Sequence, residues 1–271
     1  FSIYFIYYII KSNKYSKNIF YMIKFILVAL GLFLYLVLFI PAMLILLIVR
    51  KFRPDISTSV AQGMVSAVFR LMIFITGSKV EVRGSENIPE NGGVLFVSNH
   101  RSYFDILTGY GYTKKPLGFV SKYEMIHAPL LKQWMDLLNC LFLNRKDIKQ
   151  GLKTILKGID QVKSGVSVWI CPEGGRNMNP DVTNVKEFKE GSLKIAEKGK
   201  VPIVPVAIYG TYEIWEEHLP YMKKSKVIIE YGNPIIIDEL TDNEKKKLGA
   251  YTRSKIVDML ENIVKEKKAH K

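Results

Sequence analysis

The stretch GVLFVSNHRSYFD, residues 93–105, decides how this chain folds. Its first half is an apolar run that predicts a buried strand, and the helical pattern that starts at Ile106 predicts a helix directly after it. His100 therefore lies in a strand-to-helix turn, and Asp105 lies in the first turn of the helix. A histidine and a carboxylate meet where the chain changes direction.

The spacing of these two residues supports two interpretations. The Asp105 carboxylate can accept the proton on one imidazole nitrogen of His100 and leave the other nitrogen free to take a proton from a hydroxyl. Alternatively, Ser102 and Asp105 match a capping box, with Ser102 as the N-cap and Asp105 folding back to the backbone. The seven residues 99–105 favour neither interpretation over the other.

From residue 79 onward, short apolar runs alternate with helical patterns. This alternation predicts an α/β domain over residues 78–271, built on a largely parallel mixed sheet with flanking helices. No internal repeat or low-complexity linker divides it. We expect strands at 80–82, 94–97, 117–120, 140–143, 166–171, 203–208 and 227–229, and helices between them, notably at 148–162 and 188–198.

Residues 22–77 predict a membrane-anchoring helical region in front of this domain. Residues 25–49 contain no charged side chain, and as a helix they would be about 37 Å long, enough for a hydrocarbon core of about 30 Å. Gly31 and Pro41 interrupt the segment, so it forms either a straight span or a kinked or re-entrant helix pair. The basic run RKFR at 50–53 places the domain on the cytoplasmic side of the cell membrane.

Residues 60–76 predict a second, amphipathic helix. Polar residues recur there every three or four positions and form one stripe: Ser59, Gln62, Ser66 and Arg70. Such a helix lies at the membrane interface or packs on the domain as an ordinary core-facing helix.

The chain opens with Phe1, and its first methionine is Met22. We expect residues 1–21 to be an upstream extension that the native protein lacks. Mass spectrometry of the intact protein from its native host tests this, because a mature start before Met22 would disprove it.

The composition limits the partners and the chemistry. A formal charge of +14 on 271 residues, with 48% hydrophobic content, calls for an anionic partner such as a nucleic acid, an acidic lipid surface or a phosphorylated substrate. No nucleic-acid-binding motif is recognisable, and the membrane segment argues against that class. Cys140 and Cys171 are too few for a disulfide framework, and the histidines lack metal-ligand spacing, so we expect no metal.

Further polar residues follow the predicted strands, where open α/β sheets place their sites. Lys122 and Arg145 come at the ends of two of them. The stretch CPEGGRN, residues 171–177, adds Glu173, two glycines and Arg176 at one turn. Glycines permit close backbone approach, and arginine binds phosphate through two parallel hydrogen bonds. Singly, each is explained as a surface charge or a loop ion pair, but together with the histidine and aspartate they predict a site for a phosphate-bearing alcohol.

In this order the motifs resemble those of the glycerolipid acyltransferases of the 1-acyl-sn-glycerol-3-phosphate acyltransferase type. The NHxSxxD motif matches 99–105, a KxE-like segment with a downstream arginine matches 122–125 and Arg145, an FPEGTR-like motif matches 171–176, and a VPIVPV-like strand matches 201–206. The resemblance runs from about residue 79 to residue 211. Cys171 replaces the usual phenylalanine and Gly175 the usual threonine, and the latter change bears on phosphate affinity or acceptor choice.

The resemblance implies transfer of a fatty acyl group from acyl-CoA or acyl carrier protein to the sn-2 hydroxyl of lysophosphatidic acid, which yields phosphatidic acid. The resemblance implies His100 and Asp105 as catalytic residues, and the reaction that it implies needs no cofactor. The implied substrate-binding residues are Lys122, Arg145, Glu173, Gly174 and Arg176. Glycerol-3-phosphate or another lysophospholipid is an alternative acceptor, and a non-enzymatic membrane-tethered lipid-binding protein is the alternative from another class.

Overall fold

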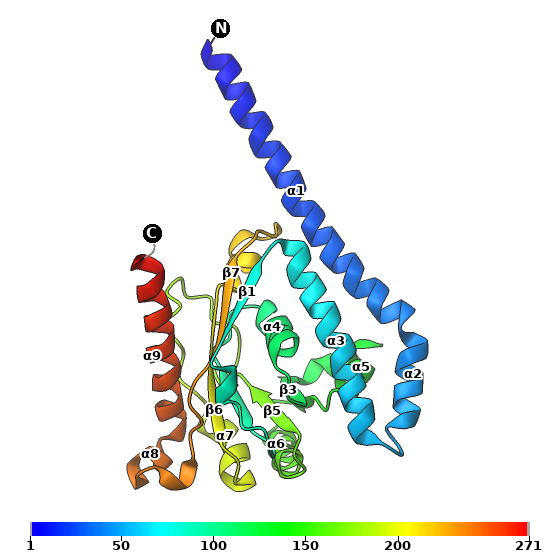
Figure 1. Ribbon diagram of the computed structural model, residues 1–271, viewed down its shortest axis with the longest axis vertical. Coiled ribbons are helices and arrows are strands. Elements are labelled where there is room, and N and C mark those ends of the chain that lie inside the picture. Colours follow the sequence, from blue (N-terminus) through cyan, green and yellow to red (C-terminus); the bar gives the residue numbers. More distant parts are fainter. Residues whose placement is uncertain (1, 270–271) are drawn as a thin grey trace.

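A seven-stranded sheet runs through the computed structural model of the protein, which describes residues 2–269, with side chains from residue 16 onward (Figure 1). The strands follow the order β1-β7-β6-β2-β5-β3-β4, and every neighbouring pair is parallel except β6 with β7. Their bounds are β1 (Lys79–Arg83), β2 (Leu95–Ser98), β3 (Leu117–Lys122), β4 (Leu141–Leu143), β5 (Ser167–Ile170), β6 (Ile203–Tyr209) and β7 (Lys226–Tyr231). All seven predicted strands are confirmed, as is the largely parallel mixed sheet.

Helices cover both faces of the sheet, so its central strands β2 and β5 are buried along their whole length and are mostly apolar. On one face, α6 (Ile148–Lys163), α7 (Glu190–Gly199) and α9 (Leu248–Ala269) share a core with side chains such as Val97 and Val168. On the other face, α2 (Ile40–Val49), α3 (Pro54–Thr76), α4 (Phe104–Tyr112) and α5 (Leu131–Leu137) pack around Phe96 and Trp169. The predicted helices at 148–162 and 188–198 correspond to α6 and α7.

Short helical turns complete the domain. They are η1 (Ser85–Asn87), η2 (Tyr123–His127), η3 (Tyr212–Ile214), η4 (Glu216–His218), η5 (Ile237–Glu239) and the five-residue helix α8 (Asp242–Lys246). Of these, η3 and η4 follow the carboxyl end of β6 and therefore lie at the edge where the parallel strands end.

The N-terminal helix α1 (Ser2–Leu38) runs without a break through Met22, and it extends far from the sheet in Figure 1. The helix is interrupted at Phe39, and Pro41 stands at the start of α2, where its missing N–H is tolerated. The predicted interruption at Pro41 is thus confirmed, whereas Gly31 lies inside α1. After α2 the chain reverses, and Ser57 Oγ of α3 donates to the Leu46 carbonyl of α2 at 2.8 Å.

The middle of the predicted polar stripe of α3, Gln62 and Ser66, faces the domain, whereas Ser59 and Arg70 at its two ends are exposed. Gln62 Nε2 donates to the Lys115 carbonyl at 2.8 Å, Gln62 Oε1 accepts from the Leu117 N–H at 3.0 Å, and Ser66 Oγ donates to the Tyr110 carbonyl at 2.6 Å. Large apolar side chains of the same helix, Leu71 and Phe74, are left exposed. Of the two predicted arrangements, the structure shows α3 packed on the domain with an apolar outer face.

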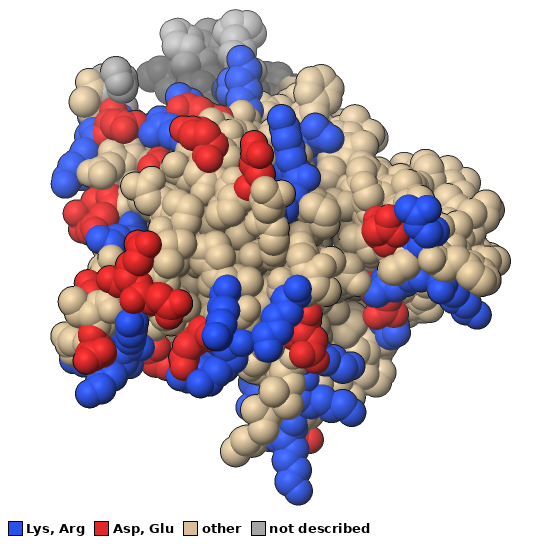
Figure 2. Space-filling view, turned by 60° about the horizontal axis from the view of Figure 1, so that its bottom comes forward, with Lys and Arg blue, Asp and Glu red and all other residues tan. Residues whose placement is uncertain are grey.

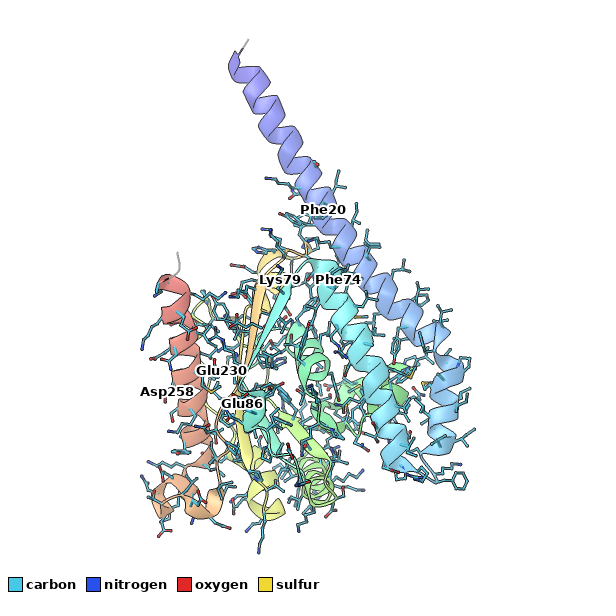
Figure 3. The ribbon with its side chains drawn as sticks, viewed as in Figure 1. Phe20, Phe74, Lys79, Glu86, Glu230 and Asp258 are labelled. Carbon is cyan, nitrogen blue, oxygen red and sulfur yellow. The ribbon has the colours of Figure 1, made fainter. Side chains whose placement is uncertain are left out.

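Large apolar side chains are exposed on the outer sides of α1, α2 and α3. Helix segments 16–38 and 54–76 are long and apolar enough to cross a membrane by length and composition. Their exposed side chains include Phe20, Phe33 and Leu38 on α1 and Phe74 at the end of α3, and Figure 3 places Phe20 and Phe74 at the same end of the molecule. Such a surface is consistent with membrane association. Lysine and arginine side chains instead follow the rim of the face seen in Figure 2, many of them along its lower edge, with acidic side chains among them.

Candidate active site

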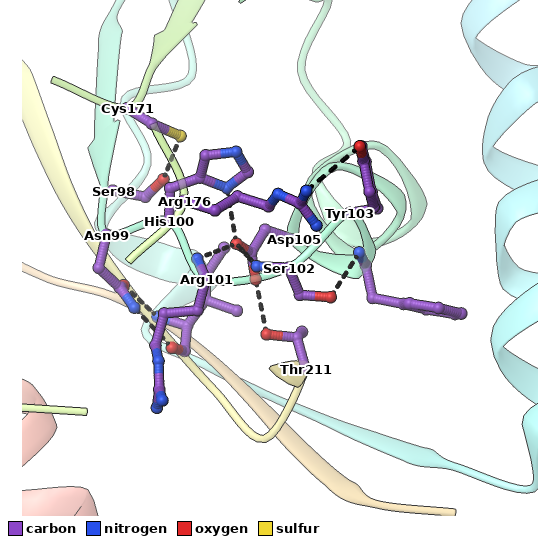
Figure 4. A network of polar contacts seen from close by, with 12 residues as sticks. Ser98, Asn99, His100, Arg101, Ser102, Tyr103, Asp105, Cys171, Arg176 and Thr211 are labelled. Atoms are coloured by element: carbon purple, nitrogen blue, oxygen red, sulfur yellow. Dashed lines mark hydrogen bonds and ion pairs between the residues drawn. The ribbon is translucent and has the colours of Figure 1, made fainter. Parts of the chain in front are cut away.

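His100 and Asp105 lie at the carboxyl end of β2, where the chain turns into α4 (Figure 4). His100 Nδ1 is 2.8 Å from Asp105 Oδ2. The carboxylate is acceptor-only when ionised, so Nδ1 carries the hydrogen and Nε2 is left with a free lone pair. The His100 side chain is 19% exposed and that of Asp105 is 2% exposed, so a substrate can reach the imidazole but not the carboxylate.

Four donors hold the Asp105 carboxylate. Besides His100, the backbone N–H groups of Arg101 and Ser102 donate to Oδ2 at 2.7 and 2.9 Å, and Thr211 Oγ1 donates to Oδ1 at 2.6 Å. The bond to Ser102 corresponds to one half of the predicted capping box, but the prediction of Ser102 as N-cap is wrong, because Tyr103 occupies that position and its side chain makes no capping bond. The other half is replaced, because Ser102 Oγ accepts from the Phe104 N–H at 2.9 Å rather than from that of Asp105. One carboxylate thus both orders the turn before α4 and orients the imidazole.

The turn at 171–177 fixes the backbone of His100 from two sides. Glu173 Oε1 accepts from the His100 N–H at 2.7 Å, and the Asn177 N–H donates to the His100 carbonyl at 2.7 Å. Glu173 Oε2 accepts from the Lys186 N–H at 3.0 Å. Burial raises the pKa of Glu173 from its ordinary value, while the backbone N–H groups that donate to it lower that pKa and offset part of this effect.

Arg176 is held over an aromatic ring beside a buried carboxylate. Its guanidinium lies 3.9 Å from the centre of the Tyr103 ring, and Nη2 donates to the Tyr103 hydroxyl at 3.3 Å. Nη1 pairs with Glu216 Oε1 at 3.1 Å, and the Glu216 side chain is 1% exposed. Because the Arg176 side chain is 32% exposed, part of the guanidinium is open to an anionic ligand.

The two remaining predicted cations have different environments. Arg145 Nη1 donates to the Gly174 carbonyl, so Arg145 joins the turn that holds His100. Gly174 has φ +80°, a conformation that favours glycine. Lys122 is 70% exposed, and its one ion pair among the described side chains is with Glu124 at 3.1 Å. The structure therefore connects all the predicted site residues except Lys122.

Comparison with known proteins identifies the family of the chain. A family model described as acyltransferase matches residues 79–209. The chain is 30% identical over 200 residues to a 1-acyl-sn-glycerol-3-phosphate acyltransferase of Borreliella burgdorferi, covering 74% of this chain and 79% of that protein. The chain belongs to the 1-acyl-sn-glycerol-3-phosphate acyltransferase family.

Other members of the acyltransferase family extend the comparison. A 1-acyl-sn-glycerol-3-phosphate acyltransferase of Saccharomyces cerevisiae is 27% identical over 196 residues, which is 72% of this chain and 64% of that protein. The crystal structure of the acyltransferase PlsC from Thermotoga maritima superposes with a TM-score of 0.75 at 24% identity, covering 91% of this chain and 98% of that one, which confirms the fold. The enzyme is an O-acyltransferase.

Cys171, which replaces the usual phenylalanine of this acyltransferase family, is not poised as a nucleophile. Burial raises the pKa of the Cys171 thiol to about 12 and that of Cys140 to about 11. The thiolate is the reactive form, so both thiols stay neutral near pH 7. Cys171 Sγ lies 3.4 Å from Ser98 Oγ, which in turn accepts from Trp169 Nε1 at 2.8 Å.

Sequence reasoning missed three residues of the acyltransferase site. Glu216 accepts from Ser102 Oγ at 2.6 Å and from the Tyr103 N–H at 2.8 Å, so it joins the NHxSxxD turn to Arg176. Tyr103 stacks under that arginine, and Thr211 bonds Asp105. Glu216 and Thr211 come more than 100 residues after Ser102 and Asp105, in a segment whose local pattern gives no signal. The serine of the motif was the only available clue, since a buried hydroxyl needs a partner.

An aromatic series connects the acyltransferase site to α1. The rings of Tyr103 and Trp215 lie 5.9 Å apart between centres, and Trp215 stacks on Phe25 of α1 at 5.7 Å. Because Tyr103 also holds Arg176, that guanidinium is linked to the apolar N-terminal helix through the rings of Tyr103 and Trp215. Among residues 16–269 the structure shows no cluster of three His, Cys, Asp or Glu side chains with metal-binding geometry.

Proposed function

We propose that this enzyme transfers a fatty acyl group from a thioester, acyl-CoA or acyl carrier protein, to the sn-2 hydroxyl of lysophosphatidic acid, forming phosphatidic acid. The observation that carries the proposal is the imidazole of His100, oriented by Asp105 and linked through Glu216 to the part-exposed guanidinium of Arg176. Two related proteins are named for the same acceptor.

His100 Nε2 removes the proton of the acceptor hydroxyl as its oxygen attacks the thioester carbonyl carbon. The tetrahedral intermediate then collapses, the carbon–sulfur bond breaks, and the departing thiolate takes the proton back from the imidazolium. Protons balance within one turnover and no covalent enzyme intermediate forms. The step requires no cofactor and no metal, so we expect the activity to survive chelation with EDTA.

The remaining residues act by binding and positioning. Arg176 binds the acceptor phosphate, and Arg145 contributes a second cation next to the Gly174 carbonyl. Glu173 holds the backbone of His100 in place. For Lys122, which is exposed at the carboxyl end of β3 and paired with Glu124, we propose a role in binding the phosphate or the developing oxyanion. One well-placed donor to that oxyanion supplies about 3 kcal/mol.

We also propose that the enzyme lies on the cell membrane with its catalytic domain on the cytoplasmic side. The apolar outer faces of α1, α2 and α3 support the first part, and the basic run at 50–53 supports the second. Arg50 of that run also bonds Asn139 Oδ1 at 2.7 Å, so it ties the helix pair to the domain.

A panel of acceptors tests the proposal. The purified, membrane-reconstituted enzyme is given one labelled acyl thioester together with lysophosphatidic acid, glycerol-3-phosphate or lysophosphatidylcholine, and the lipid products are identified. We expect the highest kcat/KM with lysophosphatidic acid. A preference for either other acceptor would establish the alternative acyltransferase, and no transfer to any of them would favour the lipid-binding protein.

A further inference from the structure

Helix α6 carries an exposed aliphatic stripe that the proposed mechanism does not use. Ile148, Leu152 and Leu156 are spaced four residues apart and therefore follow one side of the helix. Their exposed fractions are 88%, 59% and 52%. The buried side of α6 packs into the domain in the usual way, with Ile159 and Val162 covered.

Lysines accompany this stripe. Lys149, Lys153 and Lys157 each follow one of the three aliphatic residues, and Lys146 precedes the helix; all four side chains are exposed. None of the four is in an ion pair with a side chain that the structure describes, in contrast to Lys194 of the neighbouring α7, which pairs with Glu197 at 2.5 Å. We call these seven residues the α6 surface. It is both apolar and strongly cationic.

The α6 surface begins at the active-site edge of the sheet. Arg145 precedes α6 by three residues and bonds the Gly174 carbonyl, and the adjacent Glu173 holds the backbone of His100. A partner seated on α6 therefore ends beside the turn that carries the catalytic imidazole.

The α6 surface also lies away from the apolar helices. α6 shares its core with α7 and α9 on one face of the sheet, whereas α2 to α5 cover the other face (Figure 1). A bilayer in contact with the outer faces of α1 to α3 is on the far side of the sheet, so the position of α6 favours a water-soluble partner. A convex helix face with three large aliphatic side chains suits a protein surface better than a small nucleotide, which binds in concave sites.

We propose that the α6 surface docks an acidic, helical acyl carrier protein, and that this carrier protein is the physiological acyl donor. The inference rests on the proposed function, in which the donor is a thioester. Acidic side chains of the carrier complement the four lysines, which speeds encounter and sets orientation, and an apolar side of its helix covers Ile148, Leu152 and Leu156. The carrier's thioester arm then enters the site past Arg145.

A charge-reversal variant tests this inference. Lys149, Lys153 and Lys157 are changed to glutamate together, and kinetics are measured with palmitoyl acyl carrier protein and with palmitoyl-CoA. We expect KM for the carrier protein to rise about tenfold or more, with KM for the CoA thioester and kcat for both donors unchanged within about twofold. The matched control reverses the same number of exposed lysines elsewhere, Lys246, Lys247 and Lys268, and should leave both donors unaffected.

Direct binding provides a second measurement that does not depend on turnover. In an NMR titration of labelled palmitoyl acyl carrier protein with the enzyme, the double variant I148S/L152S should bind at least tenfold more weakly than the wild type. An equal rise in KM for both donors overturns the inference. A result in which KM for the carrier protein does not rise and the double variant binds as tightly as the wild type overturns it as well. So does a charge-reversal variant that loses binding to phosphatidylglycerol vesicles while its carrier-protein kinetics stay normal. If the wild type transfers no acyl group from either donor, the proposed function fails, and the titration still decides the docking.

Discussion

Asp105 performs two tasks with one carboxylate group. It accepts from the backbone N–H groups of Arg101 and Ser102, in the turn before α4, and also from the His100 imidazole and the Thr211 hydroxyl. Bonding the backbone beside the helix and orienting the imidazole, which the sequence presents as alternatives, are therefore compatible. The backbone before α4 fixes the carboxylate by hydrogen bonds, and the carboxylate orients the imidazole. The local fold therefore positions a catalytic group.

Arg176→Ala should affect one substrate and not the other. A hydrogen bond to a charged group contributes about 1.5–3 kcal/mol, so KM for lysophosphatidic acid should rise about 10- to 100-fold while KM for the thioester stays constant. Initial rates with each substrate varied in turn provide the measurement. Glu216→Gln is the companion variant: it keeps an acceptor for Ser102 but loses the charge that pairs with Arg176, so the same KM should rise by a smaller factor. An increase confined to the thioester would rule out the phosphate role.

The two glycines of the 171–177 turn should tolerate substitution differently. Gly174 has φ +80°, where alanine is strained by about 1 kcal/mol, whereas a Cβ at Gly175 meets nothing within 4 Å. In thermal unfolding, Gly174→Ala should lower Tm by about 2–4 °C, and Gly175→Ala and Gly175→Thr should not lower it. Equal losses in Tm at both positions would show that the conformation of the turn is not the cause.

The orientation of α3 about its axis could not be predicted from its sequence pattern alone. Periodicity revealed that Gln62 and Ser66 share one side of a helix, but not which side meets the domain. The structure turns that side inward because the loop after α4 leaves backbone groups that need partners: the Lys115 carbonyl and the Leu117 N–H bond Gln62. The same inward side also buries Val65 and Ile73, while Leu71 and Phe74 on the outer side stay exposed.

Gln62→Leu tests this arrangement. The substitution leaves buried backbone groups near 115 and 117 without partners, at a cost of about 2 kcal/mol, so Tm in detergent should fall by about 4–8 °C. Ser59→Ala, an exposed position on the same helix, is the control and should change stability by less than about 0.5 kcal/mol. A Gln62→Leu protein as stable as the wild type would mean that the stripe is not needed for packing.

The sheet was predictable because each of its strands is a short apolar run between turn residues. The strand-to-helix turn was predictable too, and with it the pairing of His100 and Asp105. Glu173 was expected from the separate motif at 171–177, but its bond to the His100 backbone was not. Glu216, Thr211 and Tyr103 were not predictable, because their roles depend on which distant segments the topology brings to the same edge of the sheet. The short helix α5 also gave no usable pattern: its seven residues are too few for periodicity to define.

At the scale of the whole molecule, two different surfaces flank one site. The apolar faces of α1 to α3 lie on one side of the sheet and the α6 surface lies on the other, while His100 sits at the edge between them. The proposed substrates differ in the same way, because a lysophospholipid resides in the bilayer and a carrier protein in water. Phe25 and Trp215 join the apolar side to the site.

Vesicle binding tests the assignment of the apolar face. Phe33 and Leu38 are 61% and 66% exposed, so Phe33→Lys with Leu38→Lys should leave the fold intact. Each large apolar side chain buried in lipid contributes about 1.5–3 kcal/mol, and co-sedimentation with phosphatidylglycerol vesicles should therefore weaken more than tenfold. Ile148→Lys on α6 is the control and should bind vesicles like the wild type. If the α6 variant lost binding and the α1 variant kept it, the membrane-facing side would be misassigned.

The most direct test of His100 as the general base is acyl transfer to lysophosphatidic acid by the His100→Ala variant in reconstituted membranes. General-base catalysis contributes about 10²–10⁴ in rate, so kcat should fall by that factor. Tm should stay close to that of the wild type, because the imidazole lies at the surface of the site and the backbone of residue 100 keeps its bonds to Glu173 and Asn177. Near-normal turnover by a folded His100→Ala enzyme would show that His100 is not the general base.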